Sequence, residues 1–218
     1  MKAMILAAGR GVRMRPLTDS LPKPLIRIHG KPLIQYHIEA LAAAGVTEIV
    51  INVSHMAGRI KGYLEDGKRF GVNIQYSFEK HPLEMAGGII QALPLLGDQP
   101  FIVISADIWT DYQYSHLPHQ PEKMAHLVLV NNPEENPAGD FSLVGGVVTE
   151  PNQDAYTFGG IGVYRPELFH GLEQSVMTIG PILREAIPKH LVTGEIFAGR
   201  WHNVGNLQQV KALNAAYV

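Results

Sequence analysis

The sequence predicts an α/β fold built on a doubly wound, mostly parallel sheet with helices on both faces. Over the first 110 residues, short apolar runs alternate with longer segments that have the periodicity of helices. This alternation is typical of parallel sheets, because each helix must cross one face of the sheet to start the next strand. Hydrophobic residues make up 46% of the 218 residues, which suffices for the core that such a sheet requires.

Four strands are expected in this first part. Residues 3–7 read AMILA, a short apolar run followed by Gly9, as in a buried strand. The same pattern predicts strands at 47–53, 73–77 and 100–109. Ligands of doubly wound sheets bind beyond the carboxyl ends of the strands. The loop after the first strand and Asp107 in the fourth are therefore expected at the binding edge.

Three helices are expected between these strands. Residues 31–45 place apolar side chains at helical spacing, with Pro32 near the start and Gly45 at the end. Residues 54–66 predict a second helix with Ser54 as its N-cap. The apolar segment 85–97 predicts the third.

The pattern changes after about residue 120. Strands are expected at 126–132, 157–164 and 195–204, a glycine-turn hairpin at 141–154, a helix around Pro181 at 174–189, and a closing helix at 206–217 capped by Asn206 or Gly205. The absence of repeats and linkers predicts a single domain, 1–218. Its region 140–200 is expected to form a lobe that faces the ligand.

Composition excludes several classes of protein. A net charge of −2 argues against a nucleic-acid-binding protein, and the absence of cysteine excludes disulfides and thiolate metal sites. No apolar stretch approaches the roughly 18 residues of a membrane span, and the first apolar run is too short for a signal peptide. We therefore expect a cytoplasmic protein that binds neither nucleic acid nor membranes.

The loop after the first strand combines glycines with cations. Gly9 and Gly11 let the backbone approach a ligand, and consecutive N–H groups in such a turn bind anions. Arg13 and Lys23 supply donors suited to phosphate oxygens, whereas Arg15 could equally be an ordinary solvated cation. The loop therefore predicts a polyphosphate site.

Other motifs fit poorly. A Walker loop is absent, and a dinucleotide fingerprint would need glycine where Met14 stands and an acid where Asn52 ends the second strand. His116 and His119 have metal-like spacing, but Pro118 lies between them and no carboxylates cluster nearby.

The string L-A-A-G-x-G-x-R-M-x-P-L-T at 6–18, followed by P-K-P-L at 22–25, resembles the signature of the sugar-1-phosphate nucleotidylyltransferases. The resemblance extends through residues 31–34, Glu84, the Gly87–Gly88 pair and Asp107, and covers nearly the whole chain. It is strongest with short single-domain members that use N-acetylmuramate 1-phosphate with UTP, or mannose 1-phosphate with GTP.

The resemblance implies a Rossmann-like fold, related to the GT-A fold, with a small β-containing lobe on the sugar side. Residues 1–120 would bind the nucleotide, and 121–218 would bind the sugar and supply the closing helix. The partners would be a nucleoside triphosphate and a sugar 1-phosphate, the cofactor Mg²⁺, and the assembly a monomer or homodimer. A cytidylyltransferase acting on a non-sugar phosphate remains an alternative.

The resemblance also implies roles for individual residues. Arg13 would contact the β- and γ-phosphates, Lys23 the α-phosphate and the sugar phosphate, and Asp107 would bind Mg²⁺ together with Asn203. The nucleotide contacts would come from Leu6, Ala7, Ala8, Gly9, Gly11, Glu84, Gly87 and Gly88, and the sugar contacts from Asp140 and Gly160.

Some of these residues also have structural interpretations. Gly87 and Gly88 could be packing glycines at a helix start, Glu84 an acid that favours a helix N-terminus, and Asp107 a turn cap.

One position departs from the family. A segment of the form W-x-D-x-G-T usually supplies a second metal-binding aspartate, but residues 201–206 here read WHNVGN, with Asn203 in its place. An amide oxygen binds Mg²⁺ without negative charge, so a weaker metal site is expected. This leaves two hypotheses, an enzyme with a weakened metal site and a binding protein with little or no catalysis.

Overall fold

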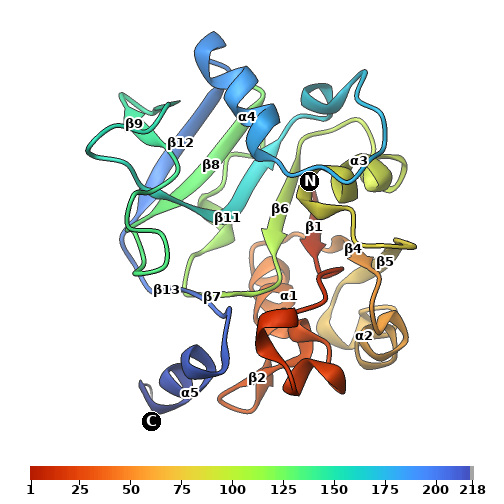
Figure 1. Ribbon diagram of the computed structural model, residues 1–218. Helices are drawn as coiled ribbons and strands as arrows, with labels where there is room; N and C mark the ends of the chain where they lie inside the picture. Colours follow the sequence, from red (N-terminus) through yellow and green to blue (C-terminus); the bar gives the residue numbers. More distant parts are fainter. Residues whose placement is uncertain (217–218) are drawn as a thin grey trace.

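The computed structural model describes residues 1–216, which form a nine-stranded main sheet with helices on both sides (Figure 1) and two small two-stranded sheets. The strand order is β5-β4-β1-β6-β11-β8-β12-β10-β9. The first four of these are parallel and are formed by β1 (Lys2–Leu6), β4 (Glu48–Val53), β5 (Asn73–Phe78) and β6 (Phe101–Ser105). The predicted parallel half is therefore confirmed.

The second half of the sheet is mixed. Strand β11 (Thr157–Tyr164) runs antiparallel to both β6 and β8 (Ala125–Val130), while β12 (Val192–Phe197) runs parallel to β8. The predicted hairpin is present as β9 (Ser142–Val144) and β10 (Val147–Thr149). Its turn requires glycine, because Gly145 and Gly146 have φ values of 57° and 81°.

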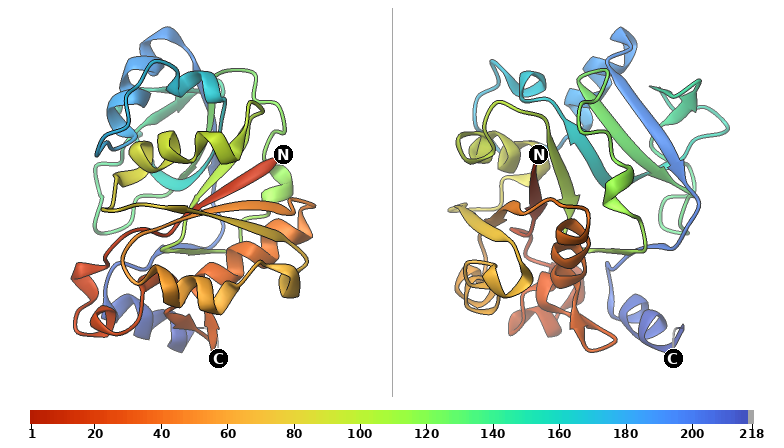
Figure 2. Two further views of the ribbon diagram at one scale, coloured as in Figure 1. Left: turned by 90° about the vertical axis from the view of Figure 1, so that its right-hand side faces the viewer. Right: turned by 180° about the vertical axis from the view of Figure 1, so that it is seen from behind.

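Alternating side chains of the strands fill a core on each face. Ile5 of β1 packs in the cluster shared with α1 (Leu33–Ala43) and α2 (Ala57–Leu64), whereas its neighbour Met4 packs with α3 (Glu84–Leu96) and α4 (Gly180–Ala186). Figure 2 shows the orange and yellow-green helices on opposite faces. Each fully buried aliphatic side chain contributes about 1.5–3 kcal/mol to the stability of the fold. Helices cover both faces of the sheet because both faces are apolar.

Two predicted strands are each divided. The one at 100–109 ends at Ser105 and resumes as β7 (Ile108–Thr110), which leaves the main sheet to pair with β13 (Trp201–Asn203). The one at 195–204 is divided between β12 and β13. The chain bends between them at Gly199, and Asp111 accepts hydrogen bonds from Arg200 N (2.8 Å) and Nε (2.7 Å). Sequence periodicity does not register such a change of sheet.

Helix boundaries also differ from the prediction. The helix expected at 174–189 is limited to α4 and a short 3₁₀ turn at 187–189, because Pro181 starts it and the preceding residues pair with the start of α3. Ser54 is not an N-cap, since Met56, with φ 55°, precedes α2. Asn206 does cap α5 (Leu207–Ala216), where its Oδ1 accepts Gln209 N–H at 2.9 Å. The expected end of this helix at Tyr217 lies outside the described residues.

The described chain has no helix that combines the length and the apolar character needed to cross a membrane.

Candidate active site

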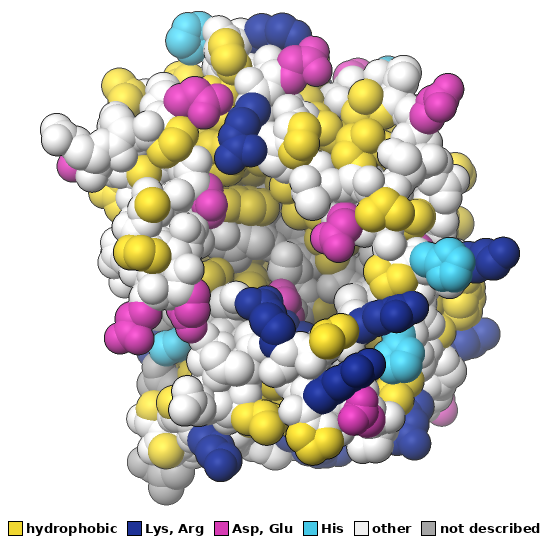
Figure 3. Space-filling view, viewed as in Figure 1, with side chains coloured by type: hydrophobic (Ala, Val, Ile, Leu, Met, Phe, Trp, Pro, Cys, Tyr) yellow, Lys and Arg dark blue, Asp and Glu magenta, His cyan; other side chains and the backbone are white. Residues whose placement is uncertain are grey.

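A cavity of about 210 Å³ opens at the carboxyl ends of β1, β4, β5 and β6. Figure 3 shows this face hollowed at its centre, with Lys and Arg side chains gathered along the lower rim. The lining residues are Leu6, Ala7, Ala8, Gly9, Lys23, Pro24, Asn52, Glu79, Pro82, Glu84, Met85, Ser105, Ala106 and Asp107. Seven predicted site residues are among them. Gly11, Arg13, Gly87, Gly88, Asp140, Gly160 and Asn203 lie outside the lining.

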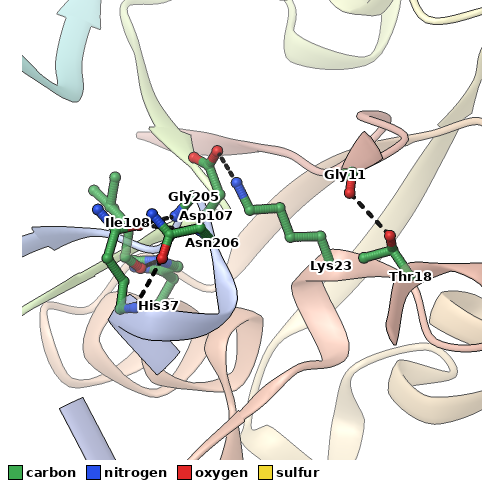
Figure 4. Close-up of polar contacts among 9 residues, drawn as sticks. Gly11, Thr18, Lys23, His37, Asp107, Ile108, Gly205 and Asn206 are labelled. Atoms are coloured by element: carbon green, nitrogen blue, oxygen red, sulfur yellow. Dashed lines mark hydrogen bonds and ion pairs between the residues drawn. The ribbon is translucent and has the colours of Figure 1, made fainter. Parts of the chain in front are cut away.

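The turn after β1 is held by a buried threonine. Gly11 has φ 62°, and its carbonyl accepts a hydrogen bond from Thr18 Oγ1 at 2.9 Å (Figure 4). A β-carbon at Gly11 would lie 3.0 Å from Thr18 Cγ2 and 3.2 Å from Lys23 Cβ. Glycine is therefore required both for the backbone conformation and for the approach of Lys23. Thr18 lies in the family signature, but the sequence did not suggest a separate role for it.

Lys23 points from a short 3₁₀ turn, Lys23–Leu25, to the end of β6. Its side chain is only 10% exposed, and its Nζ lies 2.6 Å from Asp107 Oδ2 (Figure 4). A lysine is seldom buried unless it is paired, and the prolines on either side hold its backbone in place. The two charged residues thus meet at the cavity although 84 positions separate them in sequence.

Asn203 and Asp107 are brought together by the β7–β13 ribbon. Val204 N donates to Asp107 O at 2.8 Å, and Asn203 lies opposite Ile108 in the antiparallel register. Arg13 reaches the same corner, since a β-carbon built on Gly205 would lie 3.8 Å from both Arg13 Nη2 and Asn203 Nδ2. The structure therefore gathers Arg13, Lys23, Asp107 and Asn203 around one end of the cavity.

The oxygen atoms of Asp107 and Asn203 suit a Mg²⁺ ion that is bound jointly with substrate. Within residues 1–216, no three or more His, Cys, Asp or Glu side chains are grouped to hold a metal ion. Mg²⁺ commonly takes only one or two carboxylates from the protein and completes its shell with phosphates and water. The Asp107 carboxylate and the Asn203 amide oxygen, beside a cavity that Lys23 lines, match this pattern of Mg²⁺ coordination.

A buried polar network forms the floor of the cavity. Asn52 Oδ1 accepts Ala7 N–H at 2.8 Å, and its Nδ2 donates to Glu79 Oε1 at 2.7 Å. Glu79 Oε2 accepts Leu83 N–H at 2.9 Å, and burial raises the pKa of this carboxyl above its ordinary value. The network joins the loop after β1 to the segment that begins α3. Sequence reasoning missed Glu79, although a polar residue directly after a strand was an available signal.

The start of α3 is strained and closely packed. Glu84 lines the cavity with φ 61°, a conformation that side chains rarely adopt and that is often found at functional sites. A β-carbon at Gly87 would lie 2.1 Å from Ser175 O, and one at Gly88 would lie 2.8 Å from Asn52 Nδ2 and Glu79 Oε1. The two glycines leave room for neighbouring segments, and a nucleotide contact from either stays a prediction.

The two residues predicted on the sugar side occupy different places. Gly160, with φ 70°, packs against Ser105 of the cavity wall, where its β-carbon would lie 3.0 Å from Ser105 Oγ. Asp140 Oδ2 accepts Phe158 N–H at 2.8 Å and so anchors β11. Their contacts with a sugar stay predictions.

The fold and the position of the cavity are those of a Rossmann-like α/β protein of the nucleotidyltransferase type. The chain belongs to the nucleotidyl transferase family, whose model matches residues 2–218. The resemblance carried by residues 6–25 is thereby confirmed.

Individual relatives of the chain are nucleotidyltransferases of the same kind. The chain is 48% identical to N-acetylmuramate alpha-1-phosphate uridylyltransferase of Neisseria meningitidis serogroup B (strain ATCC BAA-335 / MC58), over 99% of this chain and 97% of the relative. It is 31% identical to mannose-1-phosphate guanyltransferase beta-B of Xenopus laevis, over 94% of this chain but only 61% of the relative. A solved structure described as a putative glucose-1-phosphate thymidylyltransferase from Bacillus anthracis superposes with a TM-score of 0.87 at 20% identity, covering 99% of this chain and 94% of that one. This last likeness concerns the fold alone.

Proposed function

We propose that this protein transfers the uridylyl group of UTP to N-acetylmuramate 1-phosphate and releases pyrophosphate. The observation that carries the proposal is the Lys23–Asp107 pair, 2.6 Å apart, which lines the cavity together with the glycine turn. The 48% identity to the Neisseria relative over almost the full length of both chains supports the choice of base and sugar. In this proposal residues 1–120 bind the nucleotide and 121–218 face the sugar.

The chemistry requires positioning and charge neutralisation rather than a general base. A phosphate oxygen of the sugar phosphate, already ionised near neutral pH, attacks the α-phosphorus of UTP. The bond from that phosphorus to the bridging oxygen breaks, and its electron pair leaves with pyrophosphate. A reaction of this kind is accelerated mainly by holding the two phosphates in line and stabilising charge on their oxygens.

Each residue has a role in this scheme. The backbone N–H groups of Ala8, Gly9 and Gly11 hold the nucleotide phosphates, and Arg13 binds the departing pyrophosphate. Lys23 moves from Asp107 to the α-phosphate and the incoming sugar phosphate. Mg²⁺, held by Asp107 and Asn203, would supply positive charge to the nucleotide phosphates. The segment from Glu84 to Gly88 lies against the base, over the Asn52–Glu79 network.

The test is a matrix of four nucleoside triphosphates against a panel of sugar 1-phosphates, with the nucleotide sugar and pyrophosphate both quantified. The expected result is the highest rate with UTP and N-acetylmuramate 1-phosphate. A preference for GTP and mannose 1-phosphate would replace the substrates but retain the reaction. Failure to form nucleotide sugar from any pair would contradict the proposal.

Asn203 favours a second candidate, a protein that binds a nucleotide sugar with little or no turnover, because a metal site with one carboxylate is weaker. Labelled pyrophosphate and UDP-N-acetylmuramate distinguish the two. An enzyme forms labelled UTP by the reverse reaction, whereas a binding protein retains the nucleotide sugar unchanged.

A further inference from the structure

A buried histidine outside the cavity lining contacts β7, the strand that begins directly after Asp107. His37 of α1 is 2% exposed, and its Nε2 lies 2.9 Å from the carbonyl oxygen of Ile108, the residue after Asp107 (Figure 4). Its Nδ1 lies 2.7 Å from Tyr114 Oη, which is buried as well. A buried imidazole loses hydration that an aliphatic side chain would not lose, so two well-placed partners are needed to offset the cost.

The two partners fix the protonation of the ring. A carbonyl oxygen can only accept, so Nε2 carries the hydrogen and donates it to Ile108 O. Nδ1 then accepts from the Tyr114 hydroxyl, and both ring nitrogens are satisfied. Burial lowers the pKa of His37 from 6.5 to about 4, which keeps the ring neutral under ordinary conditions.

The bond fixes the Ile108–Trp109 peptide, which begins one residue after Asp107. Asp107 O accepts from Val204 N at 2.8 Å, and the next carbonyl, that of Ile108, accepts from His37. Ile108 also lies opposite Asn203 in the β7–β13 register. Two consecutive carbonyls are thus fixed by two different elements, at the point where the chain leaves the main sheet. A rotation of either peptide would change the backbone path at Ile108 and so move Asp107 relative to Asn203.

We propose that His37 is a positioning residue, which orients the Ile108–Trp109 peptide at the start of β7 so that Asp107 and Asn203 can bind a divalent cation together. The inference rests on the proposed function, since it assigns these two residues to the metal. It gives the buried face of α1 a role in metal affinity in addition to packing. Partners that orient metal ligands commonly change affinity by about 10- to 100-fold when they are lost.

Two substitutions of His37 each keep one of its two hydrogen bonds and remove the other. In H37Q the amide nitrogen can occupy the place of Nε2 and donate to Ile108 O, whereas the bond to Tyr114 is lost. In H37N the shorter amide lies near the place of Nδ1, so Tyr114 keeps a partner and Ile108 O loses its donor. Y114F removes only the hydroxyl and leaves the Ile108 bond. H37M is an apolar substitution of adequate volume that removes both bonds.

The metal can be followed without turnover. Trp109 and Trp201, the two tryptophans of the chain, lie on the β7–β13 ribbon within two residues of Asp107 and Asn203. Bound Mn²⁺, which is paramagnetic, should therefore quench their fluorescence. The full chain is titrated with Mn²⁺ in the presence of UTP and without acceptor, and the thermal midpoint is measured in parallel for each variant.

The expected result is a rise of about tenfold in half-saturating Mn²⁺ for H37N and H37M, with H37Q and Y114F within about twofold of the wild type. A loss of thermal stability without a change in Mn²⁺ affinity in H37N or H37M would overturn the positioning role and leave the proposed function intact. If neither variant folds, H37Q decides, because it keeps the donor and a rise of about tenfold in it would overturn the inference. A wild-type protein that shows no quenching with UTP would overturn the inference and the proposed metal site together.

Discussion

Lys23 Nζ lies 2.6 Å from Asp107 Oδ2, so the carboxylate proposed to bind the metal is already paired with a cation. A cation at this position competes with Mg²⁺ for the same oxygen. In the proposed mechanism the competition ends when phosphate oxygens of the substrates draw Lys23 away. The pair therefore disfavours metal binding before the nucleotide is present.

The first prediction follows from this competition. K23M should lower turnover by about 100-fold or more, because a donor aimed at the reacting phosphates is lost. The same change should raise the Mn²⁺ affinity of the nucleotide-free protein by about fivefold, since Asp107 loses a competing cation. Initial rates and tryptophan quenching by Mn²⁺ measure the two effects.

K31M is the matched control, because Lys31 lies just before α1 and pairs with Glu39 of that helix at 2.5 Å. It removes the same charge and should change neither quantity. Weaker metal binding in K23M than in the wild type would show that Lys23 supports the metal rather than competing with it.

A second prediction concerns Arg13. Its side chain is exposed and approaches Gly205, so R13A should leave the fold intact while turnover falls by about 100-fold from the loss of a phosphate donor. R15A serves as the control, because Arg15 is exposed and paired with Asp19 at 3.1 Å. Steady-state rates and thermal midpoints of both variants decide the matter. Equal losses of turnover in R13A and R15A would point to a general effect of positive charge.

A third prediction concerns the departure from the family signature. N203D should lower the half-saturating Mg²⁺ concentration by about tenfold, because a second carboxylate adds charge to the proposed ligand set. A magnesium titration of the initial rate is the measurement.

N206D is its control, since this substitution adds the same charge three residues away, and the new carboxylate could still accept the Gln209 N–H bond that caps α5. If the two variants shift the magnesium titration equally, the effect comes from the added negative charge in this region, and Asn203 is not a ligand.

Individual strands and helices were predictable, because the apolar pattern that identifies each one lies within its own residues. Residues 3–7 and 85–97 carry the apolar patterns of a strand and a helix, and both elements are present. The doubly wound pattern likewise predicts that the loop carrying Lys23, and Asp107, lie at the binding edge, and both residues line the cavity. The pairing of β7 with β13 was not predictable, because a strand that changes sheets keeps the same periodicity. Residues 174–179 follow a helical pattern, but the backbone of Met177 bonds instead to the start of α3.

His37 and Glu79 show a different limit. Position 37 lies on the buried face of an amphipathic helix, and only the tertiary structure brings Ile108 and Tyr114 to its two nitrogens. Glu79 is separated by 27 residues from Asn52, its partner. Periodicity identifies which face of an element is buried, but it does not identify which polar partners meet there.

A fourth prediction tests the packing at the start of α3. G87A should destabilise the fold by about 1–3 kcal/mol, because the added methyl would lie 2.1 Å from the Ser175 backbone oxygen and one of the two segments must move. Urea unfolding measures the change. G62A in α2 is the control, since nothing lies within 4 Å of its β-carbon, and alanine there should be neutral or stabilising by up to about 1 kcal/mol. A neutral G87A would show that the segment at 175 is free to yield.

The last prediction is a pH dependence that originates at His37. Burial lowers the pKa of this residue to about 4, against the opposing effects of its bond to Ile108 and the charge of Asp107, while its unfolded value is 6.5. Between these values the unfolded chain binds a proton that the folded chain does not, so the stability from a neutral His37 is complete above 6.5 and is lost as the pH falls toward 4. From about pH 7.5 to pH 5, the wild type should lose about 2 kcal/mol more unfolding free energy than H37Q, whose side chain does not titrate. Urea unfolding of both proteins at the two pH values measures the difference, in which the other titrating groups cancel. Parallel losses in the two proteins would place a proton on His37 in the folded state, and its Nδ1 could then no longer accept from Tyr114.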